Sequence, residues 1–141
     1  MEIREVQEED LVELKKIINE PDVIKFMPLK KVSLARIKKW YDFSKKTGDP
    51  QIFVLKNKKV FGCFSLKKNG KISIWISEKF QGKGFGLKAM DWLIDYSKKK
   101  KLKRIWCYCF KDNEKALKFY EKIGFEKKSL KENQFLLELN L

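Results

Sequence analysis

A glycine-rich loop, Gln81-Gly82-Lys83-Gly84-Phe85-Gly86, stands between a strand-like run and a helix-like run of the sequence. At the start of a helix, backbone N–H groups have no partner within the helix, and a nest of such groups binds phosphate oxygens. Glycine permits positive φ angles and leaves no Cβ between the backbone and an anion. The spacing differs from that of nucleoside-triphosphate loops and of dinucleotide-binding fingerprints. The loop therefore indicates a phosphate-bearing cofactor, with an ordinary glycine-capped turn as the alternative interpretation.

Histidine, the commonest side chain in catalytic proton transfer, is absent from the 141 residues. This absence excludes Ser-His and Cys-His nucleophile pairs and zinc sites built on histidine. The three cysteines, Cys63, Cys107 and Cys109, form no C-x-x-C pair, and two of them stand two residues apart on one expected strand. That placement is a poor disulfide geometry, so we expect three reduced, buried thiols. The ligand spacing predicts no metal site.

The charge balance describes one basic domain over residues 1–141, with 33 Lys+Arg against 19 Asp+Glu and a net charge of +14. Of the 33 basic residues, 30 are lysine, whereas base-specific readout of nucleic acid relies on the planar arginine fork, so the composition argues against nucleic acid as a partner. A lysine-rich surface also gives solubility, or attracts a polyanion such as a nucleotide cofactor. The longest stretch without charged residues is Val60–Leu66, too short to span a bilayer. The acidic N-terminus lacks a signal-peptide layout, which predicts a cytoplasmic protein that does not bind membranes.

The first half of the chain alternates between helical and strand periodicities. A strand is expected at Glu2–Glu5, and a helix follows with Leu11, Leu14 and Ile18 on one stripe, acids in its first turn and an end at Pro21. Ser33 is the expected cap of a second helix that ends before residues 47–50. Three apolar runs separated by short polar turns then predict an antiparallel meander. These runs are Gln51–Lys56, Val60–Leu66 and Lys71–Ser77.

The second half completes the expected layers. A helix runs from the glycine loop to the basic residues 98–101, and Arg104–Phe110 has the composition of a fully buried strand. Asp112 or Asn113 is expected to cap the next helix, which ends at Gly124 before two terminal strands. The strand, helix and strand around the glycine loop form a β-α-β unit, which predicts parallel strands with a right-handed crossover. The expected fold is α+β in αβα layers, a mixed, mostly antiparallel sheet of six to seven strands with helices on both faces.

A second motif stands at a fixed distance from the loop. The pattern Gln81-x-x-Gly84-x-Gly86 is followed 27 residues later by Asn113-x-x-Ala116-x-x-x-Tyr120-Glu121-Lys122-x-Gly124-Phe125. This pair of motifs resembles the GNAT family of N-acetyltransferases. The resemblance covers residues 51–130, and the segment 19–27 is similar to the subgroup of ribosomal-protein and polyamine acetyltransferases. The resemblance implies the GNAT fold, with the parallel strands splayed at the cofactor site, and an enzyme that uses acetyl-CoA and no metal.

The resemblance also implies roles for individual residues. In this family the loop and the following helix start hold the cofactor pyrophosphate, and the strand before the loop pairs with the pantetheine arm. The cofactor-binding residues implied here are Ile76, Ser77, Gln81, Gly82, Lys83, Gly84, Phe85, Gly86, Leu87, Asn113 and Tyr120. A backbone N–H near Ile76 would stabilise negative charge on the thioester oxygen. Tyr120 would protonate the departing CoA thiolate, with a plain core aromatic as the alternative.

A general-base glutamate of some family members corresponds to the position near Gly70, where this sequence has no carboxylate. Glu78 is the nearest candidate base, with a solvated surface acid as the alternative. At pH 7 an amine with a pKa of ~10.4 is neutral in about 1 in 2,500 molecules, whereas an α-amine with a pKa of ~8 is neutral in about one in ten. The missing base therefore favours the α-amine of a peptide, or a small-molecule amine with a lowered pKa.

The expected function is direct transfer of an acetyl group from acetyl-CoA to such a primary amine in a ternary complex. Trp75, Trp106 and Tyr108 either line the acceptor cleft or pack in the core. A different class remains open: a weakly active or inactive module that binds CoA or another nucleotide, or a basic RNA-binding protein on the same fold. The sequence also leaves a longer acyl donor and the choice between a monomer and a homodimer open.

Overall fold

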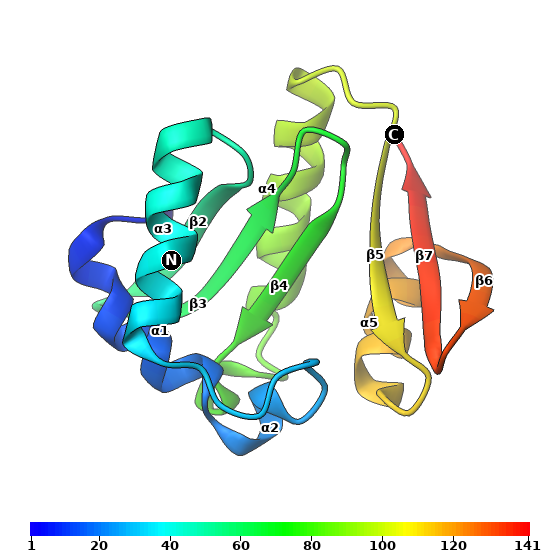
Figure 1. Ribbon diagram of the computed structural model, residues 1–141. Helices are drawn as coiled ribbons and strands as arrows, with labels where there is room; N and C mark the ends of the chain where they lie inside the picture. Colours follow the sequence, from blue (N-terminus) through cyan, green and yellow to red (C-terminus); the bar gives the residue numbers. More distant parts are fainter.

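The computed structural model describes residues 1–141 as five α-helices and seven β-strands (Figure 1). The elements are β1 (Glu2–Glu5), α1 (Leu11–Ile18), α2 (Pro21–Ile24), α3 (Leu34–Thr47), β2 (Gln51–Asn57), β3 (Lys59–Leu66), β4 (Ile72–Ile76), α4 (Phe85–Lys99), β5 (Arg104–Phe110), α5 (Glu114–Ile123), β6 (Glu126–Lys131) and β7 (Gln134–Asn140). The predicted caps are present, because the Ser33 hydroxyl accepts from the Arg36 N–H and the Asn113 side chain accepts from the Ala116 N–H. None of the helices has the length and apolarity needed to cross a membrane.

The strands form two hydrogen-bonded sheets. Antiparallel pairing gives the order β1-β2-β3-β4 in one sheet and β5-β7-β6 in the other. The sheets join where a parallel bridge pairs Lys71, just before β4, with Trp106 of β5. The expected mixed, mostly antiparallel arrangement of seven strands is therefore confirmed, with the parallel contact confined to one end of the strand pair.

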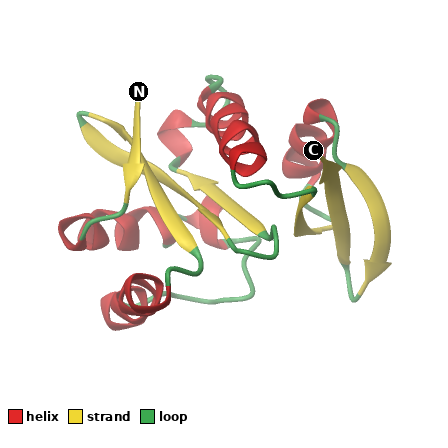
Figure 2. Ribbon diagram, turned by 90° about the horizontal axis from the view of Figure 1, so that it is seen from above, coloured by secondary structure: helices red, strands yellow, loops and turns green.

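Helices pack on both faces of the four-stranded sheet. In two perpendicular views α1 and α3 lie on one face of the four-stranded sheet and α4 lies on the other (Figures 1 and 2). Leu14, Ile37 and Val54 belong to a core between α1, α3 and this sheet, and Leu93 and Ile105 belong to a larger core beneath α4 and α5. The larger core spans both sheets, so it fixes the position of β5 relative to β4.

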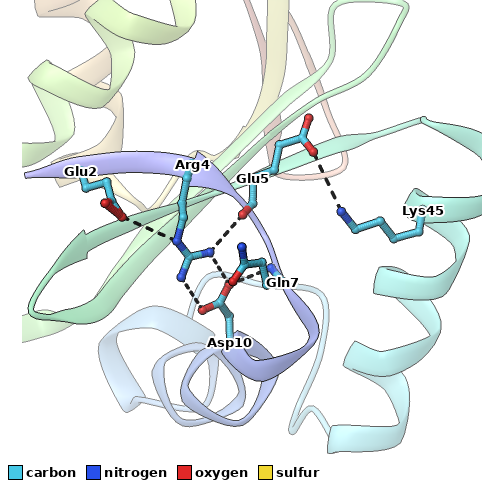
Figure 3. A network of polar contacts seen from close by, with 6 residues as sticks. All are labelled: Glu2, Arg4, Glu5, Gln7, Asp10 and Lys45. Atoms are coloured by element: carbon cyan, nitrogen blue, oxygen red, sulfur yellow. Dashed lines mark hydrogen bonds and ion pairs between the residues drawn. The ribbon is translucent and has the colours of Figure 1, made fainter.

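A buried carboxylate joins β1 to the start of α1 (Figure 3). Both terminal nitrogens of Arg4 donate to the carboxylate of Asp10 over 2.8 Å, and the Gln7 N–H donates to the same carboxylate over 2.7 Å. Burial alone would raise the pKa of Asp10, but the hydrogen bonds from Arg4 and Gln7 outweigh it and hold this pKa below 3.8. The ionised pair therefore stabilises the fold above pH 3.8, and this contribution is lost as the pH falls through the lowered pKa.

Two local expectations are corrected. The strand β5 is not fully buried, since its residues alternate and Tyr108 is 52% exposed. One face of β5 packs in the core, while the other is exposed because α1 and α3 pack on the four-stranded sheet and not on β5. The acids Glu8–Asp10 form a separate 3-10 turn before α1, and α1 ends at Ile18 rather than at Pro21. Pro21 instead begins α2, where its missing N–H has no helical partner to lose.

Candidate active site

An open cleft lies where β4 and β5 diverge, and we call it the central cleft. At the bridge, the Trp106 N–H donates to the Gly70 carbonyl over 3.0 Å, and the strands separate towards their carboxyl ends (Figure 1). The cleft has a volume of about 1520 Å³. It is lined by β4, β5, the start of α4, α5 and the segment between α2 and α3. Such an opening at the ends of parallel strands is a common position for a ligand site.

The glycine loop has the geometry of an anion nest. The N–H groups of residues 82–87 donate no hydrogen bond within the chain, and the first helical bond of α4 runs from the Lys88 N–H to the Gly84 carbonyl over 3.2 Å. Gly84 has a φ of +86°, and a Cβ added to it would have no atom within 4 Å. The glycines of this loop line the central cleft. A phosphate can therefore approach several unpaired N–H groups at the positive end of the α4 dipole.

The open edge of β4 offers a second set of backbone donors. The Ser77 N–H donates to the Phe61 carbonyl of β3, so the N–H groups of alternate residues in β4 point towards β3. Ile74 and Ile76 lie between those residues, and their N–H groups point towards the cleft. The Ile76 carbonyl accepts from the Gln81 side chain over 2.8 Å, and the Lys115 ammonium donates to the other end of that amide. Gln81 thus connects the strand, the loop and α5.

Tyr120 lies at the boundary between the core and the central cleft. It is 8% exposed, lines the cleft and packs edge-on against Phe119 and Phe125. Burial raises its pKa well above 10.0, and the neighbouring thiols of Cys107 and Cys109 raise it further. The phenol is therefore neutral at physiological pH and able to donate a proton. Burial likewise raises the pKa of Cys107 to about 12, which leaves this thiol unreactive.

The structure brings most of the predicted site residues to the central cleft. Ile76, Gln81, Gly82, Gly84, Gly86, Leu87, Asn113 and Tyr120 line it. Ser77, Glu78, Lys83 and Phe85 do not: Phe85 packs against Phe61 and Phe80, Lys83 lies over the Phe80 ring, and the Glu78 carboxylate accepts from the Asp22 N–H over 2.8 Å. Trp75 and Tyr108 also line the cleft, whereas the Trp106 indole N–H donates to the Asn69 carbonyl.

Glu20 is a site-supporting residue that the sequence patterns did not indicate. Its carboxylate accepts from the Ser77 hydroxyl over 2.8 and 3.0 Å and from the Glu78 N–H over 2.8 Å. The preceding residue, Asn19, exchanges hydrogen bonds with the backbone of Val32 over 2.8 Å in both directions. These contacts fix the segment between α1 and α3 to the end of β4. The partners are distant in sequence, so no local spacing could identify them.

We expect Glu20→Ala to lower the free energy of unfolding by about 1–3 kcal/mol, because it leaves the buried Ser77 hydroxyl without its acceptor. Urea denaturation measures this change. Glu20→Gln retains an acceptor oxygen and should recover more than half of the loss. Equal unfolding free energies for Glu20→Ala and the unmodified protein would show that the hydrogen bonds from Ser77 and Glu78 to Glu20 do not stabilise the fold.

Gly70 shows why no general base stands at the start of β4. Its φ is +93°, and a Cβ added to it would lie 2.5 Å from the Arg104 carbonyl oxygen. Backbone atoms cannot give way as a flexible side chain could, so any larger residue would separate β4 from β5. The close approach of the two strands at the bridge thus excludes a carboxylate at this position.

A family model described as "Acetyltransferase (GNAT) family" matches residues 12–125 of the chain. Among curated proteins, the spermine/spermidine N(1)-acetyltransferase of Bacillus subtilis is 36% identical over 63 residues. This match covers 42% of the chain and only 41% of the length of that enzyme.

Solved structures share the fold along the entire chain. A spermidine N-acetyltransferase from Vibrio cholerae, solved in complex with CoA and spermine, has a TM-score of 0.86 and 21% identity, covering 99% of this chain and 94% of its own. A ribosomal-protein-alanine N-acetyltransferase from Brucella melitensis has a TM-score of 0.84 and 19% identity, with complete coverage of both chains (100% and 100%). At these identities the likeness establishes the fold.

Proposed function

The chain belongs to the acetyltransferase (GNAT) family, and from this premise we propose that it transfers an acetyl group from acetyl-CoA to a primary amine by direct attack. The observation that carries the proposal is one cleft that joins the unpaired N–H groups of the glycine loop to the neutral phenol of Tyr120. The first feature suits a pyrophosphate and the second suits a leaving thiolate. The two features together support an enzyme over a module that only binds a nucleotide.

Each group of the chain has one task in this reaction. Acetyl-CoA supplies an acetyl group activated as a thioester. The N–H groups of residues 82–87 and the free amide hydrogens of Asn113 would hold the phosphates and the adjacent arm. The Ile76 N–H would donate to the carbonyl oxygen as negative charge develops during attack by the amine nitrogen. Tyr120 would give its proton to the sulfur as the C–S bond breaks, the proton lost by the amine would pass to water, and the tyrosinate would regain a proton from water.

The acceptor must arrive substantially neutral, because Gly70 leaves no room for a carboxylate base and Glu78 does not line the central cleft. Glu78 as a base remains a prediction, and it would require this carboxylate, which accepts the Asp22 N–H through one oxygen, to reach into the cleft. An α-amine meets the requirement better than a lysine side chain does, since about one in ten such amines is neutral at pH 7. We therefore propose the α-amine of a peptide as the acceptor group.

Mass spectrometry tests the proposed reaction. The protein is incubated with acetyl-CoA and a mixture of free amines: short peptides, amino acids, lysine derivatives and spermidine. We expect a mass increase of one acetyl group on a peptide α-amine and stoichiometric release of CoA. Binding of acetyl-CoA without acetylation of any amine in the mixture would instead identify a cofactor-binding module.

A further inference from the structure

The central cleft has a second side, on the sheet face that carries α3. Ser73 and Trp75 of β4 point to this face, because they alternate with the isoleucines directed towards the core. Trp40 and Phe43 of α3 line the same cleft and are 37% and 59% exposed. Tyr108 of β5 is also exposed and lines it. We call this surface, formed by Ser73, Trp75, Trp40, Phe43 and Tyr108, the acceptor side. Three of its four aromatic residues are exposed.

The charges of the acceptor side are predominantly positive. Lys25, Lys67 and Lys71 line the cleft, and none of them forms an ion pair. Only two acids, Asp22 and Asp49, line it, and the Asp49 carboxylate already accepts from the Lys68 N–H over 2.9 Å. A polyamine, which is a chain of cations, would meet these lysines with little compensating negative charge. The surface instead suits an acceptor that carries an anionic group of its own.

Lys71 is held in position to bind that group. Its ammonium lies 5.6 Å from the ring centre of Trp106 and 5.5 Å from that of Tyr108, so the two rings support it above β5. Ser73, on the same face of β4, shares a 2.6 Å hydrogen bond with Ser65 of β3. Only one hydroxyl hydrogen is used in that bond, so the other is free to donate to a ligand. Lys71 and Ser73 stand two residues apart on one face of the sheet, so an ammonium and a hydroxyl donor flank the same surface and suit a carboxylate.

The strand geometry sets the distance from this anion site to the reacting carbonyl. Ser73 precedes Ile76 by three residues, and a strand rises about 3.3 Å per residue, which gives roughly 10 Å. A carboxylate bound at the level of Ser73 would therefore lie roughly 10 Å from the attacking nitrogen. In an extended peptide this is the distance from the α-amine to an acidic side chain at the second residue, or to the terminal carboxylate of a tripeptide. A free α-amino acid is too short.

Resting on the proposed function, we propose that the acceptor is the α-amine of an extended peptide with a carboxylate at this distance, bound by Lys71 and the Ser65–Ser73 pair, with apolar side chains against Trp40, Phe43 and Tyr108. Lys71 and Ser73 are then specificity-determining residues for the acceptor. The acidic side chain and the terminal carboxylate are two sources of the same chemistry, and matched peptides separate them.

The test measures kcat/KM for four peptides and, in parallel, their binding to the CoA-saturated protein by calorimetry. Alanyl-glutamyl-alanine amide is compared with alanyl-glutaminyl-alanine amide for the side-chain source, and trialanine with trialanine amide for the terminal source. We expect the acidic member of at least one pair to be favoured about 10- to 100-fold, as for one charged hydrogen-bonded contact. The pair that shows the preference identifies the source.

Lys71→Gln should remove this preference without changing the KM for acetyl-CoA, and Ser73→Ala should reduce it. Lys68→Gln is the matched control, since Lys68 neighbours the same turn but does not line the cleft. Equal binding of acidic and neutral peptides, or a preference for spermidine, would overturn the inference while leaving acetyl transfer in place. Failure of CoA itself to bind would overturn the proposed function instead.

Discussion

Tyr120→Phe is expected to lower kcat by about 100-fold while leaving the Kd of acetyl-CoA nearly unchanged. Tyr120 lines the central cleft, and the raised pKa of its phenol keeps the proton on the oxygen until a strongly basic thiolate forms. Phenylalanine preserves the ring contacts with Phe119 and Phe125, so the core should remain intact. Stopped-flow measurement of thiol release under single-turnover conditions gives the rate of the chemical step.

Tyr96→Phe is the matched control, because the Tyr96 phenol donates to the Gln51 side chain and does not line the central cleft. It should retain kcat. The pH profile adds an independent readout. The rate should rise as the acceptor amine loses its proton. Deprotonation of Tyr120 should lower the rate only near its own pKa, which lies well above 10.0. An unaltered single-turnover rate in Tyr120→Phe would remove this tyrosine from the mechanism.

Gly84→Glu is expected to weaken acetyl-CoA binding by at least about 100-fold. The new carboxylate would extend from the centre of the N–H nest, where it repels the phosphates and competes for their donors. Gly84 adopts a φ of +86°, so the side chain also forces the loop out of the left-handed region that favours glycine. Equilibrium titration with acetyl-CoA measures the change in Kd.

A control variant separates the two effects of Gly84→Glu, which are backbone strain and loss of the N–H nest. Gly48 has a φ of +71°, has no atom within 4 Å of an added Cβ, and does not line the central cleft. Gly48→Glu should therefore destabilise the fold by about 1–2 kcal/mol, as Gly84→Glu does, without affecting acetyl-CoA binding. Similar Kd values for the two variants would show that the nest does not bind the cofactor.

Most element boundaries could be predicted because their signals are local. Ser33, Asn113 and Gly124 start or end helices through contacts within a few residues, and the sequence shows them directly. The glycine loop and Tyr120 could be recognised from the sequence because their two motifs stand at a characteristic spacing. The sequence did not predict which residues of the loop face the cleft, since Lys83 and Phe85 do not line it.

The remaining features depend on contacts between distant segments. The position of β7 between β5 and β6 follows from long-range pairing, which no local pattern specifies. One face of β5 is exposed because α1 and α3 pack on the four-stranded sheet and leave it uncovered, so an apolar run that looked fully buried borders the cleft. The hydrogen bond from Ser77 to Glu20 joins residues 57 positions apart, and neither residue type indicates the presence of the other.

The central claim is that the glycine loop and the cleft bind acetyl-CoA, and isothermal titration of the purified protein with acetyl-CoA tests it most directly. A short RNA is titrated in parallel at two salt concentrations, because a net charge of +14 could bind polyanions without any specific site. The account predicts saturable one-to-one binding of acetyl-CoA at micromolar concentration. No binding of acetyl-CoA, together with RNA binding that falls steeply with salt, would contradict it and assign the function to the basic surface.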